Sequence, residues 1–151
     1  MSKKFMVAVD GSEHGWKALD LATNMASNSD AELVIVHVGP YEPLPEGLGQ
    51  FARLEGLSVE ELKSRYLQDK AIGDRIATEA EARARKNGLA RVTMQVAEGN
   101  PANQIVELAK SEGTEMVFLG SRGLGDIKGL LMGSVSHKVM NLAPCTCVAV
   151  K

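Results

Sequence analysis

The sequence predicts an α/β protein built on a single, doubly wound sheet of five parallel strands with helices on both faces. Short apolar runs alternate along the chain with longer amphipathic stretches, the order expected of β-α-β units. Most of the runs are continuous rather than alternating, as in strands buried on both faces. The chain has 151 residues, which fits one domain over residues 1–151. The expected strands are Phe5–Val9, Leu33–Val38, Arg91–Ala97, Met116–Leu119 and Cys145–Val150.

The first β-α-β unit opens the chain. Ser12 follows the first strand and is a suitable cap for a helix that ends near Asn28. We expect the inner face of this helix to carry Leu19, Ala22 and either Met25 or Ala26. His37 lies inside the second strand and is interpreted as a core histidine with satisfied hydrogen bonds.

The middle of the chain is predicted to be a loop or lid followed by a long helix. Residues 39–57 contain three prolines and four glycines, a composition typical of loops. Ser58 and Glu61 form a capping box for a helix over Val59–Lys86, which Gly73 weakens at its centre. The basic residues near the end of this helix are interpreted as a solvated surface.

The second half contains an alternating strand, Arg91–Ala97, typical of a strand packed on one side. Asn100 then caps a helix with Pro101 at its first position, and Gly113 ends it. Cys145 and Cys147 lie two apart in the last strand, so they face the same side and are interpreted as buried thiols.

Composition excludes several classes of function. The formal charge of −2 and the isoelectric point near 5.9 argue against nucleic acid as a partner. No apolar run approaches the roughly 18 residues of a membrane span. The N-terminal segment has too few consecutive apolar residues for the core of a signal peptide, so a cytoplasmic location is expected.

A glycine-rich loop carries the functional signal. The Met116–Leu119 strand ends at Gly120, further glycines follow at 123, 125, 129 and 133, and a helix is expected to begin at Gly133 or Ser134. The unpaired N–H groups of a helix N-terminus behind such a loop bind phosphate. The spacing matches neither a Walker loop nor a dinucleotide fingerprint, because Gly133 replaces the lysine of the first and Lys128 a glycine of the second.

The spacing of Gly120, Gly123, Gly133 and Ser134 resembles the G-x2-G-x9-G-[S/T] signature of the universal stress protein family, in its ATP-binding subgroup. The segments 7–12 (VAVDGS) and 143–145 (APC) also resemble that family. The resemblance implies a sheet of the adenine nucleotide α-hydrolase type with strand order 3-2-1-4-5. It further implies an ATP ligand, with Mg²⁺ carried by its phosphates, and a homodimer formed through Cys145–Val150, an apolar edge strand.

The same resemblance, together with the loop itself, assigns the nucleotide site. Asp10 and Gly120 should face each other across a crevice, although Asp10 also suits a turn that caps the first helix. Gly123 and Gly133 would bring backbone N–H groups to the phosphates, Ser134 would offer a hydroxyl and cap the helix, and Arg122 would either reach a phosphate or remain solvated. The expected binding residues are Ala8, Val9, Asp10, Val38, Leu119, Gly120, Arg122, Gly123, Gly133, Ser134, Val135 and Ser136.

The expected function is that of an ATP-binding regulatory stress protein with at most slow hydrolysis. The three histidines form no recognisable triad or metal set, so no catalytic or metal-binding residue is assigned. The alternative is an enzyme of the same fold superfamily that cleaves ATP or transfers its nucleotidyl group, but the SGGxDS and HIGH signatures of such enzymes do not occur. A flavodoxin-like electron carrier is a weaker alternative.

Overall fold

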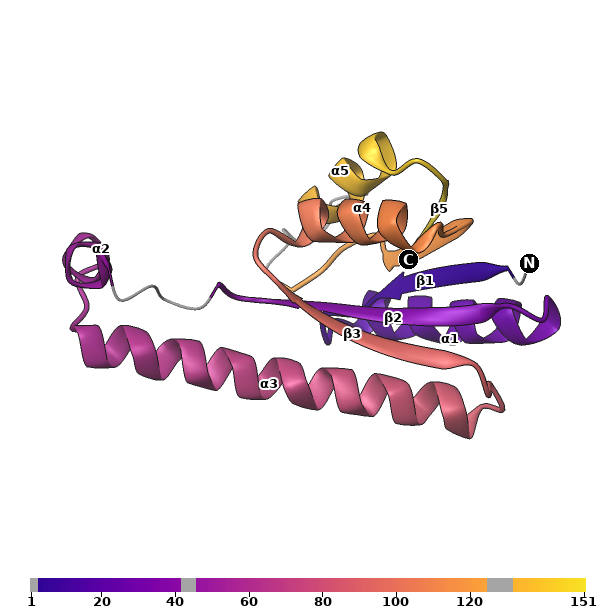
Figure 1. The fold of residues 1–151 in the computed structure, drawn as a ribbon, viewed down its shortest axis with the longest axis horizontal. Coiled ribbons are helices and arrows are strands. Elements are labelled where there is room, and N and C mark those ends of the chain that lie inside the picture. Colours follow the sequence, from indigo (N-terminus) through magenta and orange to yellow (C-terminus); the bar gives the residue numbers. More distant parts are fainter. Residues whose placement is uncertain (1–2, 42–45, 125–131) are drawn as a thin grey trace.

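A computed structural model describes residues 3–41, 46–124 and 132–151. It contains one parallel sheet with the strand order β3-β2-β1-β4-β5, so both the predicted fold class and the strand order are confirmed (Figure 1). The strands are β1 (Lys4–Ala8), β2 (Glu32–Gly39), β3 (Val92–Glu98), β4 (Met116–Gly120) and β5 (Thr146–Val150). The helices are α1 (Glu13–Asn28), α2 (Leu48–Leu54), α3 (Val59–Lys86), α4 (Pro101–Glu112) and α5 (Ser134–Leu142).

Helices cover both faces of the sheet. In Figure 1, α1 and α3 lie on one side of the strands and α4 and α5 on the other. Successive side chains of a strand point to opposite faces, so the buried strands supply two separate cores. Val7 and Leu33 pack with α1 and α3, whereas Met6 and Val34 pack with α4 and α5. The continuous apolar runs of the sequence therefore reflect burial from both sides.

The helix boundaries follow the capping signals in the sequence. The Ser12 hydroxyl accepts a hydrogen bond from the Gly15 N–H, and Ser58 makes the reciprocal capping box with Glu61. Asn100 caps α4, and Gly113 ends it with a φ of 64°, in the left-handed region that glycine adopts easily. These predictions are confirmed.

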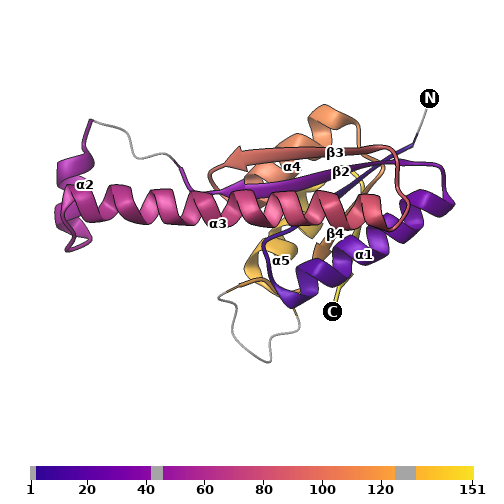
Figure 2. The same cartoon turned by 90° about the horizontal axis from the view of Figure 1, so that it is seen from below.

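Residues 39–57 contain a helix, so the expectation of a loop was wrong for part of this segment. Leu48 and Ala52 of α2 lie one turn apart and pack against Leu62 of α3 in a small separate core. The many glycines and prolines around α2 hid this spacing. Figures 1 and 2 show that α2 and the first turns of α3 extend beyond the sheet as an arm.

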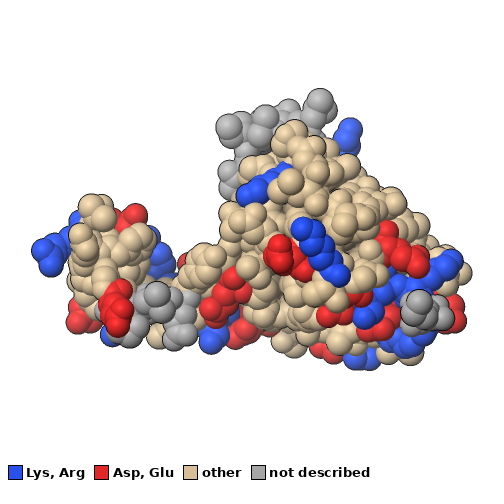
Figure 3. All heavy atoms as spheres, turned by 45° about the horizontal axis from the view of Figure 1, so that its top comes forward, with Lys and Arg blue, Asp and Glu red and all other residues tan. Residues whose placement is uncertain are grey.

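The surface carries no segregated charge on the face shown in Figure 3, where basic and acidic side chains are interspersed. None of the helices in the described ranges is long and apolar enough to cross a membrane. The glycines at 125 and 129, like Lys128, lie outside the described residues.

Candidate functional site

A cavity of about 270 Å³ opens at the carboxyl ends of the central strands β1 and β4. These two strands are adjacent and parallel, with Val7 paired to Phe118. From β1 the next two strands, β2 and β3, are added on one side, whereas β4 and β5 lie on the other side, so the strand order reverses between β1 and β4. Open parallel sheets bind ligands at such a switch point. The cavity is slightly smaller than the volumes typical of pockets for small molecules, about 300–1,000 Å³.

The structure brings the predicted site residues together. All of them except Gly133 line the cavity, so Asp10 and Gly120 do share one crevice. They come from the end of β1 (Ala8, Val9, Asp10), from β2 (Val38), from the end of β4 (Leu119, Gly120), from the loop (Arg122, Gly123) and from α5 (Ser134, Val135, Ser136). Whether they bind a nucleotide stays a prediction.

The N-terminus of α5 points free donors at this cavity. Within the described part of the chain, the backbone N–H groups of Ser134, Val135 and Ser136 donate no hydrogen bond, and all three residues line the cavity. Unpaired N–H groups and the positive end of the helix dipole together favour an anion.

The cap of α5 differs from expectation. Gly133, not Ser134, is the N-cap residue, and its φ of −77° and ψ of 170° are open to any residue. The Gly133 N–H donates to the Ser121 carbonyl, so it is not available to a phosphate in this structure. Glycine at this position is therefore not required by its backbone angles.

Ser136 was expected among the binding residues, but its hydroxyl is bonded within the protein. Its side chain is buried, and its Oγ lies 2.7 Å from the Ser121 carbonyl and 3.1 Å from that of Gly133. A hydroxyl has one proton to donate, and here a carbonyl of the protein accepts it. Ser134 is exposed at the cavity, and its hydroxyl makes no hydrogen bond to another residue in the described ranges.

Asp10 ties the turn after β1 to the loop after β4. One carboxylate oxygen accepts from the Ser12 N–H at 2.9 Å and from the Ser12 hydroxyl at 2.5 Å, and the other accepts from the Leu124 N–H at 3.2 Å. The turn role is thus confirmed, and contact with a ligand stays a prediction. The described residues contain no group of three or more His, Cys, Asp or Glu side chains that could hold a metal ion.

The buried histidine of β2 does not line the cavity but contacts Val9, which does. The His37 Nδ1 donates to the Val9 carbonyl at 2.9 Å, which confirms the interpretation of His37 as a satisfied core residue. The ring also lies against α3, because a Cβ added to Gly73 would fall 2.5 Å from His37 Nε2.

Sequence reasoning missed five residues that line the cavity: Ser12, Val36, Pro101, Ile105 and Leu124. Pro101 and Ile105 come from α4, and Ile105 also belongs to the core between α4 and the sheet. A signal was available, because α4 starts directly after β3 and the ends of parallel strands lie on one edge of a sheet.

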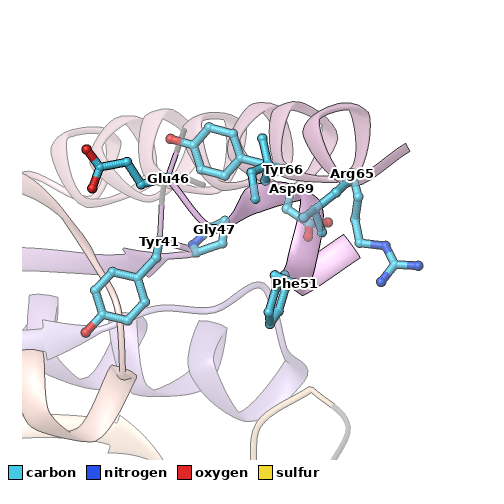
Figure 4. Close-up of a pocket in the computed structure, with 10 residues that line it drawn as sticks. Tyr41, Glu46, Gly47, Phe51, Arg65, Tyr66 and Asp69 are labelled. Atoms are coloured by element: carbon cyan, nitrogen blue, oxygen red, sulfur yellow. The ribbon is translucent and has the colours of Figure 1, made fainter. Parts of the chain in front are cut away.

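A second hollow, of about 320 Å³, lies between the arm and the end of β2. Figure 4 shows Tyr41, Phe51 and Tyr66 around it, with Arg65 pointing away from Tyr41. The Tyr66 hydroxyl is 3.4 Å from a carboxylate oxygen of Glu98. No residue of the predicted site lines this second hollow.

The two cysteines are partly rather than fully buried. The Cys147 thiol lies 3.6 Å from the Cys145 carbonyl. Burial raises the pKa of the Cys145 thiol and of the Cys147 thiol, which lowers their thiolate content at neutral pH.

Comparison with known proteins gives one consistent result. A model of the universal stress protein family matches residues 1–151. Universal stress protein YxiE of Bacillus subtilis is 34% identical over 157 aligned residues, and the alignment covers 100% of both chains.

Solved structures share the fold along nearly the whole chain. The universal stress protein UspA from Lactobacillus plantarum superposes with a TM-score of 0.80 at 19% identity and covers 99% of this chain and 97% of that one. A universal stress protein in complex with cAMP gives a TM-score of 0.66 at 25% identity, with 99% and 96% covered. One from Archaeoglobus fulgidus, in complex with dAMP, gives 0.68 at 20% identity, with 99% and 98% covered.

Proposed function

We propose that this chain, which belongs to the universal stress protein family, binds ATP in the cavity at the ends of β1 and β4 and acts as a regulatory nucleotide-binding module. The observation that carries the proposal is the set of three N–H groups on Ser134, Val135 and Ser136, which have no partner among the described residues and lie at the cavity beside the ends of β1 and β4. Complexes of related proteins with cAMP and dAMP support an adenine nucleotide as the ligand.

The lining of the cavity has two parts that suit the two halves of a nucleotide. Its strand side is apolar, with Ala8, Val38 and Leu119 available to an adenine or ribose, and its α5 side offers N–H donors to phosphates. The carboxylate of Asp10 already accepts three hydrogen bonds, so a Mg²⁺ ion would be held chiefly by the phosphate oxygens that bring it. ATP bound at about 100 times its Kd would add about 2.7 kcal/mol to the free energy of unfolding.

A thermal melt tests the proposal. With Mg²⁺ present, saturating ATP should raise the Tm by about 5–10 °C, since 1 kcal/mol shifts the Tm of a chain of this size by about 2–4 °C. Adenosine should shift it less, because it lacks the phosphates that the α5 donors would bind. If ATP, ADP and AMP all leave the Tm unchanged, the proposal is wrong.

Ser134 allows one donor to be removed without breaking the helix. It is the first helical residue, where proline is favoured, and the extended Gly133 before it suits a following proline. Ser134→Pro deletes one N–H, whereas the matched control Ser134→Ala deletes only the hydroxyl. We expect Ser134→Pro to weaken ATP binding about ten- to a hundredfold more than Ser134→Ala, of the order of one hydrogen bond to a charged group. Equal affinities for both variants would show that these N–H groups do not hold the ligand.

The proposal includes at most slow hydrolysis. Phosphoryl transfer requires a base or positioned water together with cations at the developing charge. Asp10 and Arg122 are the charged residues among the described ones that line the cavity, and the Asp10 carboxylate is held by backbone and hydroxyl donors. Many turnovers per minute of ATP by the purified protein would favour the alternative, an ATP-cleaving enzyme.

We further propose a cytoplasmic homodimer that pairs through β5. This strand lies at the edge of the sheet and bonds on one side to β4, so its other edge is open to a partner strand. The Val150 carbonyl accepts from the Ser121 N–H, so the backbone of Ala149, one residue earlier, faces the open edge. Ala149→Pro should convert a dimer to a monomer in sedimentation experiments while the far-ultraviolet circular dichroism stays unchanged. A wild-type monomer at micromolar concentration would contradict this part of the proposal.

A further inference from the structure

Three side chains meet at the mouth of the cavity in an arrangement that the sequence did not reveal. The His14 Nδ1 lies 3.0 Å from the Ser121 hydroxyl, and the Arg122 Nη2 lies 3.3 Å from His14 Nε2. A guanidinium has donors only, so Nε2 must accept, which places the proton of a neutral ring on Nδ1. The imidazole therefore donates to Ser121 and accepts from Arg122, and both ring nitrogens are engaged.

The His14 ring is held by its contacts with the end of β4 and the residue that follows it. Ser121 is 2% exposed, and its N–H donates to the Val150 carbonyl at 2.7 Å. His14 lies in the first turn of α1, directly over Gly120, where an added Cβ would fall 2.8 Å from the His14 Cβ. Glycine at the end of β4 is thus needed for the close approach of α1, and this approach brings the histidine to the loop.

We propose that His14 is a positioning residue that holds the Arg122 guanidinium at the cavity wall for the phosphate tail of a nucleotide. Arg122 lines the cavity and His14 does not, so the histidine acts through the arginine. Arg122 is the only cation among the described residues that line the cavity. An unrestrained arginine loses much rotamer freedom when it binds a phosphate, and a guanidinium already held by His14 loses less.

This inference rests on the proposed function, and it adds selectivity for nucleotides over nucleosides. A held cation at the mouth of the cavity strengthens the binding of ligands that carry a phosphate tail and does nothing for a nucleoside. The pair therefore makes the site favour ATP over adenosine.

A double-mutant cycle tests the inference by calorimetric titration with ATP and with adenosine. His14→Ala should weaken ATP binding about three- to tenfold, within the range of couplings measured for side chains in contact. It should leave adenosine binding unchanged. In an Arg122→Ala background, His14→Ala should have no further effect on ATP. His14→Gln, whose amide oxygen can accept from the guanidinium, should recover most of the affinity.

The controls separate this inference from a structural role and from the proposed function. Arg75→Ala, which removes an exposed arginine on α3 that does not line the cavity, should leave ATP binding unchanged. If His14→Ala fails to fold, His14→Leu fills the volume of the ring without an acceptor and takes its place. Additive losses in the cycle, or equal losses for ATP and adenosine, overturn the positioning role while nucleotide binding stands. Failure of the wild-type protein to bind ATP overturns both.

Discussion

Gly73 is the position where local preference and tertiary packing conflict most directly. It lies in the middle of α3, where alanine would stabilise an exposed helix by about 1 kcal/mol relative to glycine. A Cβ at this position would fall 2.5 Å from His37 Nε2 and 3.0 Å from His37 Cδ2. The question is which effect is larger for Gly73→Ala.

We expect the steric cost of the added Cβ to exceed the gain in helix propensity. The His37 ring cannot swing aside cheaply, because it is buried on a central strand and its Nδ1 is bonded to the Val9 carbonyl at 2.9 Å. Overpacking of a core costs about 1–3 kcal/mol, and loss of the His37 bond costs about 1 kcal/mol more. After the gain in helix propensity, we expect Gly73→Ala to lower the free energy of unfolding by about 1–3 kcal/mol.

Urea unfolding followed by circular dichroism measures this effect, with all variants at one protein concentration. The matched comparison is the same substitution in a His37→Ala background, where the obstructing ring is absent. There Gly73→Ala should be stabilising, by up to about 1 kcal/mol, because only the helix propensity remains. A stabilising effect in the wild-type background, or an equal loss in both backgrounds, would refute the reasoning.

Two further predictions concern titratable groups. The hydrogen bond from Lys4, at 2.9 Å, lowers the pKa of the Glu112 carboxyl below its usual 4.5, so this pair stabilises the protein above that pH. Its contribution, roughly 1 kcal/mol or less, should disappear as the pH falls through the lowered pKa, so wild type and Glu112→Gln should converge in acid unfolding titrations. Burial raises the pKa of the Cys145 and Cys147 thiols, so a thiol reagent at pH 8 should react at least about tenfold more slowly with native protein than in urea. Equal rates in both conditions would contradict the burial of these thiols.

Most of the residues predicted for the site line one cavity because they follow strands, and whether they bind a nucleotide stays a prediction. Asp10 and Gly120 come directly after continuous apolar runs, and the ends of parallel strands meet at one edge of a sheet. This logic does not reach Ile105, which lies on α4, because a helical apolar spacing looks identical whether the side chain faces a core or the floor of a cavity.

Hydrogen-bond partners were beyond the reach of the sequence. Ser136 looked like a phosphate ligand, yet its hydroxyl is bonded to the Ser121 carbonyl. The three histidines formed no recognisable set in the sequence, yet His14 contacts Arg122, which is 108 positions away in the chain. Such partners depend on how closely two elements approach, and the approach of α1 to β4 is set by the absence of a side chain at Gly120.

The sequence by itself determined the order along the chain of the strands and of the helices other than α2, and the caps at Ser12, Ser58 and Asn100, because each depends on the spacing of residues close together in the chain. Only the tertiary structure decided which N–H groups remain free for a ligand and which are bonded within the protein. It also decided that α2 and α3 extend beyond the sheet as an arm. These features arise from contacts between elements distant in sequence, where one atom too close or one donor already paired changes what a residue can do.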